Sequence, residues 1–439
     1  MINRSDVIPA ALFLFSLVAI GFAYGAWSSR SDSFPIPQLR NAWHGARRLM
    51  EEARIERPWY YEASTQSRVV ISHAQKESPL GLTLIQGMGP ANELSAKVVD
   101  AEGNVVHEWH LDIFEMWPDV RHVPENDRPK SKPGGIVHGI VFLSNGDLIL
   151  NFNYLGIARV NVCSQIIWRL PVRSHHSLHL DDNGSLYASG EILHTEPVER
   201  FANVRPPFTE DTILEVSPEG RLIGVTSIFD LLTENGLGGL LYMTTTNNDT
   251  TSVQGDMLHL NDVESFPSTL AEGTFSHGDI MISLRNLNAV LVLDRTTHKL
   301  KRSWIGAVLR QHDPDFIDGN TISIFDNNNL MPNQAGHYSR IVLLSALDDS
   351  QKVVFSGSDR HPFFTEKMGK HQWLPNGNIL ITESWRGRAL EVDATGRIVW
   401  EYFNLVEDGV VGMITEALRL PPEVDEQFFA RASLACGEP

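Results

Sequence analysis

Cysteine is almost absent from this chain, whose 439 residues include only Cys163 and Cys436. Two cysteines this far apart in sequence fit neither a disulfide framework nor a thiolate metal site, and they do not indicate a compartment. Basic residues are also scarce, because 36 lysines and arginines stand against 54 acidic residues and leave a formal net charge of -18. A chain without a basic stripe cannot neutralise a phosphate backbone, which argues against nucleic acid as a partner. An anionic substrate would have to be held by local donors.

Long hydrophobic runs are confined to one place. Residues 7–27 form an uncharged run of about twenty residues, which is long enough to cross a bilayer as a helix. We therefore expect a membrane anchor over residues 1–29, with a cleaved signal peptide as the alternative because residues 23–25 offer a small-x-small cleavage site. Both interpretations place the remainder outside the cytoplasm, in the periplasm or the extracellular space. Helical spacing of apolar residues between 37 and 57 predicts a juxtamembrane helix and linker over residues 30–66.

The rest of the chain repeats one unit, in which a histidine precedes a strand, a tight turn and a second strand. His312 precedes the turn at 318–320, and the Asn-Gly turns at 145–146 and 376–377 follow His138 and His371 in the same way. Six such units follow one another from about residue 69. One four-stranded unit cannot bury both faces of its sheet, whereas a ring of units can. The pattern predicts an all-β fold, a six-bladed β-propeller over residues 67–439; a seven-bladed ring that uses residues 229–251 is the alternative.

The tail offers a way to close this ring. The first unit lacks a leading strand, while residues 413–420 provide a spare one just before Pro421 and Pro422. We expect residues 414–420 to pair beside residues 82–85, which would leave no sheet edge exposed.

Histidines at the starts of the units form the candidate site. The leading strand of each propeller blade lines the central channel, so residues at matching unit starts are expected to converge on one opening. A single histidine there would most simply be a packed residue bonded to a neighbouring carbonyl, but a set at equivalent places indicates a shared polar cavity. His175 and His179 flank one member, and the pattern does not settle which of the three faces inward. The histidines at unit starts are His138, His176, His259, His312 and His371.

Four short motifs occur in order between residues 259 and 329. In combination they resemble the aryl sulfotransferase (arylsulfate sulfotransferase) β-propeller family, and the similarity extends over roughly residues 138–400. The resemblance implies nucleotide-independent transfer of a sulfuryl group from an aryl sulfate to a phenolic or other hydroxyl acceptor through a sulfohistidine, with no cofactor and no metal. The motifs are His259-x-Asn261, Ser283-x-Arg285, Gln311-His312-Asp313 and Phe325-Asp326-Asn327.

The same resemblance assigns roles to residues. His312 is implied as the nucleophile, and the groups implied around the sulfuryl oxygens are His176, His259, Asn261 and Arg285. The remaining convergent residues, His138, His371 and Asp313, are expected to bind substrate.

Elementary chemistry agrees with these roles. Sulfuryl transfer, like phosphoryl transfer, spreads charge over equatorial oxygens, so the protein mainly positions and neutralises. A guanidinium offers two parallel donors to such oxygens, and a neutral imidazole is a competent nucleophile near pH 7. Without the resemblance, a surface salt bridge to Asp279 or Asp294 would explain Arg285 equally well.

The chain also departs from the family. Periplasmic members carry an amino-terminal β-sandwich and a disulfide near the site, whereas few residues here separate the expected anchor from the first unit. Cys163 and Cys436 are badly placed to reproduce that disulfide. A divergent, membrane-anchored member is therefore expected.

Two other functions stay open. A non-catalytic propeller would bind a ligand in its channel or dock a membrane complex through its outer faces, and a homodimer is compatible with the sequence. A metal enzyme would use three or more converging histidines, with Asp262, Asp313 and Glu383 as oxygen ligands.

Overall fold

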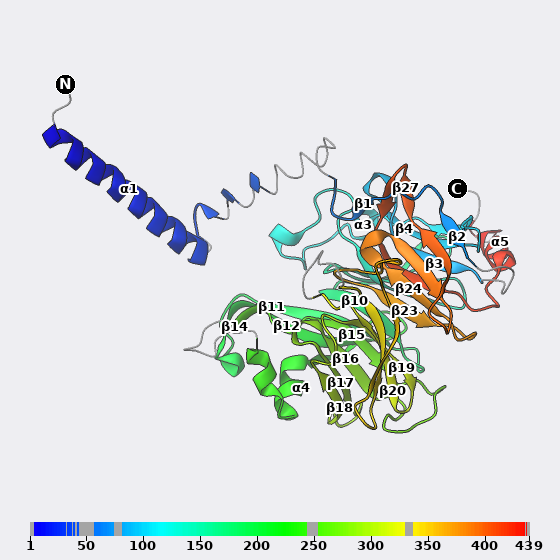
Figure 1. Cartoon of the computed structure of the whole chain (residues 1–439). Helices are drawn as coiled ribbons and strands as arrows, with labels where there is room; N and C mark the ends of the chain where they lie inside the picture. The colour runs from blue at the N-terminus through cyan, green and yellow to red at the C-terminus, as the bar shows by residue number, and fades with distance from the viewer. Residues whose placement is uncertain are drawn as a thin grey trace. The chain divides into compact units, whose positions relative to one another are not determined.

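The structure, a computed structural model, describes residues 4–31, 33–36, 38–39, 42–43, 57–73, 81–243, 253–329, 337–434 and 436 (Figure 1). The chain forms two compact units, residues 1–59 and 60–439. In the first unit, helix α1 (Arg4–Ser31) exposes most of its large apolar side chains between Phe13 and Trp27. Among the described residues, no helix combines the length and the apolar character that a membrane span requires. The expected spanning helix is thus not found there, and the helix expected between 37 and 57 falls mostly outside the described residues.

The second unit is built mainly of antiparallel sheets with four core strands, which follow one another along the chain in every sheet but the first. In strand order these sheets are β29 (Ile414–Arg419), β3 (Thr83–Met88), β4 (Leu94–Val99) and β5 (Val105–Trp109); β6 (Val137–Phe142), β7 (Leu148–Phe152), β8 (Gly156–Val160) and β9 (Ile166–Leu170); β10 (Ser174–Leu180), β11 (Leu186–His194), β12 (Val204–Val216) and β13 (Leu222–Ser227); β15 (Leu260–Ser265), β16 (Ile280–Leu284), β17 (Ala289–Leu293) and β18 (Leu300–Ile305); β19 (His312–Asp318), β20 (Thr321–Asp326), β21 (Arg340–Ser345) and β22 (Gln351–Ser356); β23 (Lys370–Trp373), β24 (Ile379–Glu383), β25 (Arg388–Val392) and β26 (Ile398–Phe403).

Smaller elements complete this unit. β14 (Val253–Asp256) pairs with β12, β2 (Val70–Ser72) pairs with β26, and a small sheet joins β1 (Tyr61–Ala63), β28 (Val410–Gly412) and β27 (Leu405–Glu407). The short helices are α3 (Ile113–Met116), α4 (Ile228–Glu234), α5 (Glu426–Leu434), η1 (Pro90–Asn92), η2 (Glu125–Asp127), η3 (Glu199–Phe201), η4 (Gly238–Tyr242), η5 (Arg285–Leu287) and η6 (Ser384–Arg386).

Burial changes across each sheet. Second strands such as β3, β7 and β16 are buried along their whole length, whereas last strands such as β13 and β22 are largely exposed. Side chains alternate between the two faces of a strand, so a strand buried throughout must be covered on both faces. The sheets therefore pack face to face and turn their last strands outward.

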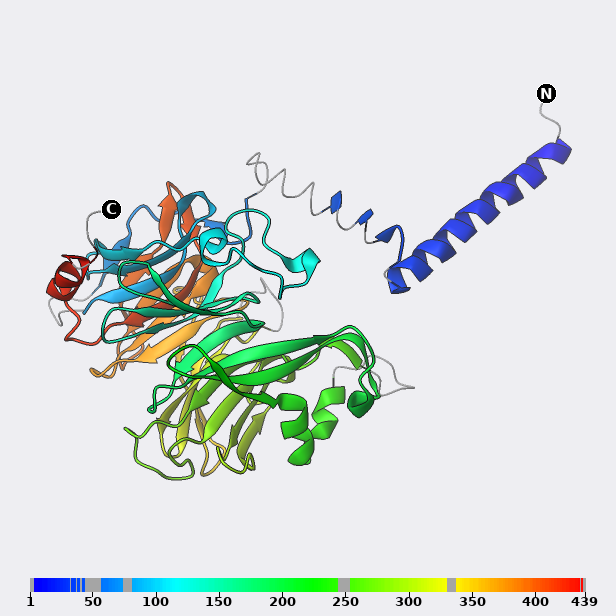
Figure 2. The ribbon, with the colours of Figure 1, turned by 180° about the vertical axis from the view of Figure 1, so that it is seen from behind.

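The segment that a seventh blade would have used is helical where it is described. Helix α4 packs against β12, and η4 packs against α4 (Figure 2). The hydroxyl of Ser227 caps α4 by accepting from the backbone N–H of Asp230 at 3.4 Å, and Phe229 is fully buried. The described part of this segment adds no strand to the ring of sheets.

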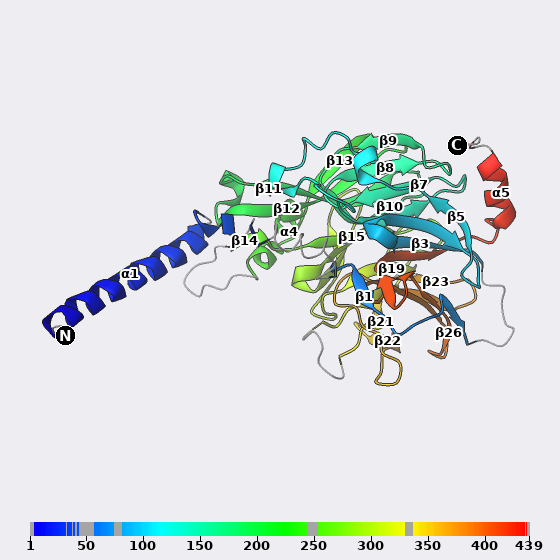
Figure 3. The same ribbon diagram turned by 90° about the horizontal axis from the view of Figure 1, so that it is seen from above.

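The first strands of the sheets meet around the middle of the second unit. β6 contacts β10, β10 contacts β15, β15 contacts β19, β19 contacts β23, β23 contacts β29, and β29 contacts β6, so the order returns to its start. Figure 3 shows β10, β15, β19 and β23 following one another around the centre. This propeller-like order brings the beginnings of strands that are distant in sequence to one place.

The tail strand pairs as the sequence predicts. β29 runs antiparallel to β3, with Ala417 opposite Ile85 and Leu418 opposite Leu84. The first sheet thus combines the last strand of the chain with its first three core strands, and the expected pairing is confirmed.

Deleting all residues after Tyr402 should abolish cooperative folding of the second unit. Met413, Ile414 and Leu420 are each at most 3% exposed. Full burial of a side chain of this size stabilises by about 1.5–3 kcal/mol, so the loss is a large part of the roughly 5–15 kcal/mol of a typical domain. Circular dichroism during heating measures it.

A matched truncation after Val424 serves as the control, because it keeps β29 and removes α5. It should still unfold cooperatively, at a lower temperature. Closure by the tail is wrong if the truncation after Tyr402 unfolds at the same temperature as the full chain.

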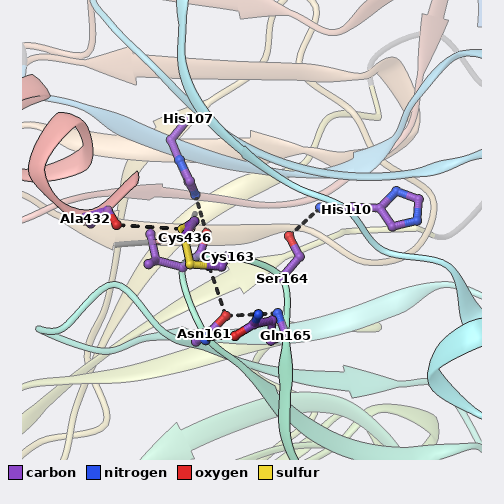
Figure 4. The surroundings of a disulfide bond; sticks show 9 residues. His107, His110, Asn161, Cys163, Ser164, Gln165, Ala432 and Cys436 are labelled. Atoms are coloured by element: carbon purple, nitrogen blue, oxygen red, sulfur yellow. Dashed lines mark hydrogen bonds between the residues drawn. A yellow bond between two sulfur atoms is a disulfide. The ribbon is translucent and has the colours of Figure 1, made fainter. Parts of the chain in front are cut away.

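Cys163 and Cys436 form a disulfide bond, with their Cα atoms 5.4 Å apart (Figure 4). The expectation that these cysteines do not pair was wrong. The reason is tertiary: after β29, helix α5 packs against β5, and its Phe429 stacks on the ring of His107 with centroids 4.9 Å apart. That ring also lies 3.0 Å from the carbonyl of Val162, next to Cys163.

Replacing both cysteines by serine should lower the free energy of unfolding by about 2–4 kcal/mol. The bond joins residues 273 positions apart, so it restricts a very long loop in the unfolded chain. Urea unfolding with and without dithiothreitol measures the effect. The reductant should lower the midpoint of the native protein to that of the double variant and leave the variant unchanged; a native midpoint insensitive to reduction would contradict the expectation.

Candidate active site

β-Bulges open the first strands of the sheets towards the centre. The register shifts in β6 after Val137, in β10 after His175, in β15 after Leu260, in β19 after His312 and in β29 after Ile414. An extra residue in a strand re-aims its side chain, and bulges are common beside active sites for this reason. The residues within these shifts are His138, His176, Ser177, Asn261, Asp313, Pro314 and Thr415.

Side chains from the bulges meet at a small cavity of about 10 Å³, the histidine cavity. The ring centroids of His138 and His176 are 4.2 Å apart, those of His176 and His259 4.8 Å, and those of His176 and His312 6.2 Å. These four histidines converge, as the sequence predicts. The cavity is lined by His138, His176, Ser177, Asn261, His312, Asp313, Met368, Gly369, Lys370 and Thr415.

Several residues at this site have a left-handed backbone. The φ angles of His176, His259, Asp313 and Met368 are 60°, 58°, 50° and 61°. For a residue other than glycine this conformation costs about 1–3 kcal/mol, and it persists only where the surrounding structure enforces it. Strain of this kind concentrates at functional sites.

His312 is hydrogen-bonded through both ring nitrogens. Its Nδ1 lies 2.7 Å from Asn327 Oδ1, and the backbone N–H of Met368 donates to its Nε2 at 3.3 Å. Because Nε2 accepts, the ring is neutral and its proton is on Nδ1. Burial, reinforced by the charge of Arg285, lowers the pKa of His312 to about 3. At neutral pH the ring is therefore an uncharged base whose Nε2 faces Met368 and the histidine cavity.

His176, rather than His175 or His179, lines the cavity. The Nδ1 of His176 lies 2.7 Å from the Nδ1 of His175. The Nε2 of His175 lies 4.0 Å from Asp211 Oδ1. His179 lies 3.0 Å from the hydroxyl of Ser265. Burial lowers the pKa of His175 to about 3 and that of His176 well below its usual value, so both rings are neutral at pH 7.

His259 and Asn261 approach the site from the start of β15. The Nδ1 of His259 is hydrogen-bonded to Asp256. Burial alone would raise the pKa of Asp256, but His259 lowers it below its usual range. The amide nitrogen of Asn261 donates to the carbonyl of Gln311 at 2.7 Å, while its Oδ1 is buried without a partner. This side of the site therefore combines an ionised carboxylate, an imidazole and an unused amide oxygen.

Arg285 lies beside these groups on η5, where its backbone N–H donates to the carbonyl of His259 at 3.1 Å. Its Nε is buried without a hydrogen-bond partner. Burial and the charge of Arg310 lower the pKa of Arg285 from its usual value. Over the part of the chain that the structure describes, no carboxylate forms a salt bridge with Arg285.

The carboxylates that were alternatives for Arg285 have other partners. Asp279 accepts from Lys301 at 2.6 Å, and Asp294 accepts from the backbone of Thr297 at 2.7 Å. The surface salt bridge considered for Arg285 is therefore not formed.

His371 lies in a second cavity of about 330 Å³, the acidic cavity, and not in the histidine cavity. Its Nδ1 is 3.0 Å from Asp313 Oδ2, and its Nε2 is hydrogen-bonded to Ser323. β23 pairs with β24 without a register shift, so no bulge re-aims its first residues. The expectation that His371 joins the other histidines was wrong. The polar groups of the acidic cavity are Ser177, His179, Asp262, Glu264, Asp313, Asp315, Lys370, His371, Gln372, Trp373 and Glu416.

Lys370 lines both cavities, as do Ser177 and Asp313. Its Nζ lies 3.0 Å from Asp313 Oδ1, 3.1 Å from the hydroxyl of Ser177 and 3.8 Å from Glu416 Oε2. Burial alone would lower the pKa of Lys370, but the charges of Asp313 and Glu416 raise it above its usual value. Asp313, expected to bind substrate, is thus already bonded to Lys370 and His371.

Carboxyl groups in the acidic cavity are shifted towards their protonated forms. Burial raises the pKa of Asp262 and of Glu416 to about 7 and raises that of Glu264 and Asp315 above the usual range.

One group of the described residues could hold a metal ion: ligand atoms of Asp313, Asp315 and His371 lie within 4.8 Å of one another. This group is in the acidic cavity, whereas the metal enzyme considered above would use the converging histidines. Glu383, a proposed ligand of that enzyme, is buried beside Arg388 at 2.7 Å.

Comparison with known proteins identifies the family. The sequence profile described as Arylsulfotransferase (ASST) matches residues 139–405, which is more than half of the chain. The chain belongs to the arylsulfotransferase family. No curated protein matches the sequence significantly.

Solved structures resemble this chain only distantly. A protein of unknown function from Bacteroides caccae is 13% identical, covers 77% of this chain and 98% of its own, and has a TM-score of 0.45. A virginiamycin B lyase from Staphylococcus aureus is 14% identical, covers 60% of this chain and 69% of its own, and has a TM-score of 0.33. Kuenenia stuttgartiensis hydrazine synthase is 11% identical, covers 74% of this chain and 79% of its own, and has a TM-score of 0.38.

Sequence reasoning did not assign several residues that the arylsulfotransferase fold brings to the histidine cavity. Ser177 and Thr415 reach it through bulges, Lys370 directly precedes His371, and Met368 contributes a backbone N–H. Asn327 was part of a recognised motif, but its contact with His312 depends on the pairing of β19 with β20.

Proposed function

We propose that this arylsulfotransferase transfers a sulfuryl group from an aryl sulfate to a phenolic or other hydroxyl acceptor through a sulfohistidine on His312, without a nucleotide sulfate donor. The observation that carries the proposal is the buried, neutral ring of His312, whose Nε2 accepts from Met368 at the histidine cavity. The guanidinium of Arg285, which forms no salt bridge with the described carboxylates, lies close enough to lower the pKa of that ring.

Two half-reactions balance the chemistry. In the first, the Nε2 lone pair of His312 attacks sulfur, an N–S bond forms, and the S–O bond to the aryl group breaks with its electron pair leaving on the aryl oxygen. In the second, the hydroxyl oxygen of the acceptor attacks the same sulfur, the N–S bond breaks, and the hydroxyl proton passes to water. The proton stays on His312 Nδ1, hydrogen-bonded to Asn327, throughout both steps, so Nε2 recovers its lone pair.

Stabilisation of the sulfuryl oxygens falls to groups already present. Arg285 offers a planar pair of donors that no carboxylate occupies among the described residues, and a guanidinium fork suits an oxyanion. The N–H of Met368 lies beside Nε2 and is placed to turn to a sulfuryl oxygen once the N–S bond forms. His176 and His259 supply further ring nitrogens around the same point.

The proposal includes a six-bladed propeller over residues 67–439 and a location outside the cytoplasm, with residues 1–29 as an export segment and 30–66 as a linker. The cyclic order of the first strands supports the ring. The Cys163–Cys436 disulfide supports the location, because such bonds persist in oxidising compartments. Maleimide should label these cysteines in denatured cell extracts only after reduction.

Incubation with p-nitrophenyl sulfate tests the reaction. The peptide that contains His312 should gain the mass of one sulfuryl group as p-nitrophenol is released, and added phenol should remove that mass. Protein treated with a chelator should behave identically. Absence of the label together with activity that depends on a metal would overturn the proposal and turn attention to Asp313, Asp315 and His371.

A further inference from the structure

Asn327 follows β20 and makes three hydrogen bonds although its side chain is fully buried. Its amide nitrogen donates to the carbonyls of Thr365 and Met368, at 3.0 and 2.7 Å. Its Oδ1 lies 2.7 Å from His312 Nδ1. One amide thus connects the ring of His312 to the chain segment 365–368.

The orientation of this amide follows from its partners. A carbonyl oxygen only accepts hydrogen bonds, so the NH₂ group must face Thr365 and Met368, and Oδ1 must face His312. An amide oxygen also only accepts, so the partner nitrogen on His312 must carry a proton. Asn327 therefore selects the ring tautomer with the proton on Nδ1 and the lone pair on Nε2.

The segment that Asn327 holds confirms this assignment from the other side of the ring. The backbone N–H of Met368 donates to His312 Nε2 at 3.3 Å, which requires a lone pair there. Met368 takes a left-handed backbone, and Gly369 packs so closely on the ring of Phe325 that a Cβ would lie 2.5 Å from it. The same amide thus fixes the ring and orders the segment that supplies its second partner.

We propose that Asn327 is a positioning residue that holds His312 in the tautomer whose Nε2 lone pair faces the histidine cavity. The inference rests on the proposed role of His312 as nucleophile. With the opposite tautomer, Nε2 would present an N–H and have no electron pair to offer to sulfur. A wrong tautomer in a catalytic histidine is known to be costly even when the geometry is otherwise kept.

Three variants separate positioning from support of the fold. Asn327→Ala removes both the acceptor for His312 and the donor for segment 365–368. Asn327→Asp keeps an acceptor for Nδ1–H but places an oxygen against two carbonyls. Asn328→Gly is the matched control, because it removes a neighbouring amide that donates to the carbonyl of Tyr338 at 3.0 Å and keeps the left-handed backbone at that position.

The first measurement needs no activity. In protein labelled with ¹⁵N at histidine, two-bond ¹H–¹⁵N spectra report which ring nitrogen carries the proton, and His312→Gln identifies the signal by its disappearance. The native protein and Asn327→Asp should show the proton on Nδ1, whereas Asn327→Ala should populate the Nε2–H tautomer. A native signal with the proton on Nε2 overturns the inference whatever the activity.

The second measurement is the rate of sulfuryl labelling as a function of pH. Asn327→Ala should lower the rate roughly 10- to 100-fold at every pH, the range seen when an outer partner that orients a ligand histidine is lost. Asn327→Asp should move the acid limb of the profile upward by about 1–3 pH units, because an adjacent carboxylate favours the protonated ring. Asn328→Gly should match the native profile.

The outcomes distinguish the two proposals. A native protein with the proton on Nδ1 but no sulfuryl label leaves the positioning intact and overturns the nucleophile. Labelling that falls in both Asn327 variants only as far as their thermal stability falls, with the native tautomer and acid limb retained, reduces Asn327 to a structural residue and overturns the inference.

Discussion

Replacing His312 by alanine should abolish sulfuryl labelling and reduce transfer to background. The variant lacks the Nε2 that accepts the sulfuryl group, while His176 and His259 keep their Nδ1 hydrogen bonds to His175 and Asp256. Mass spectrometry of the active-site peptide and release of p-nitrophenol measure the two effects. The change also leaves Asn327 Oδ1 without a partner, which costs about 1–3 kcal/mol of stability, so thermal unfolding must be followed in parallel.

His277→Ala is the control for this experiment, because that ring is half-exposed and bonded to the carbonyl of Leu270 away from both cavities. It should transfer at the native rate. Native activity in His312→Ala combined with loss of activity in His138→Ala would show that His312 is not the nucleophile and that the nucleophile lies on another strand. Native activity in both would favour a binding module over an enzyme.

Replacing Arg285 by lysine should slow transfer about a hundredfold while His312 can still be labelled. Lysine keeps a positive charge but loses the planar pair of donors, and loss of one transition-state donor typically costs this much or more. The effect should appear in kcat, because the donors act on charge that develops during the reaction. Steady-state kinetics with p-nitrophenyl sulfate, together with the extent of labelling after long incubation, separates rate from competence.

Arg295→Lys provides the matched control, since Arg295 is bound to Asp181 at 2.7 Å in a salt bridge remote from the histidine cavity. It should leave kcat unchanged. An Arg285→Lys variant with native kcat would remove the guanidinium from the mechanism, and one that cannot be labelled at all would indicate that Arg285 holds the donor in the ground state.

The pattern of neighbouring residues along the chain was sufficient to predict much of the fold. Alternating apolar residues and Asn-Gly turns predict strands because neighbouring residues alone determine which face of a strand is apolar and where the chain can reverse. The spare tail strand before Pro421 was visible for the same reason, and its pairing with β3 is observed. The four histidines that converge were predictable because they occupy matching places in a repeated unit.

The finer geometry of the site was not predictable in this way. His371 occupies the same place in its unit as the others, yet β23 lacks the bulge that re-aims the first residues of β6, β10, β15 and β19. Whether a strand bulges depends on its partner strand and on what packs across the channel. The bond between Asn327 and His312 likewise depends on the register of two strands and on segment 365–368.

By itself, the sequence determined the all-β repeat, the place of the histidines within each unit, the closing strand and the motif set of the arylsulfotransferase family. These features are recorded in residues close together along the chain. Only the tertiary structure decided that Cys163 and Cys436 are bonded, that Lys370 lines both the histidine cavity and the acidic cavity, and that His312 is held as a neutral ring whose Nε2 accepts from Met368 at the histidine cavity. Each of these depends on closure of the chain upon itself, which brings groups as distant as residues 163 and 436 into contact and removes water from charged and polar side chains.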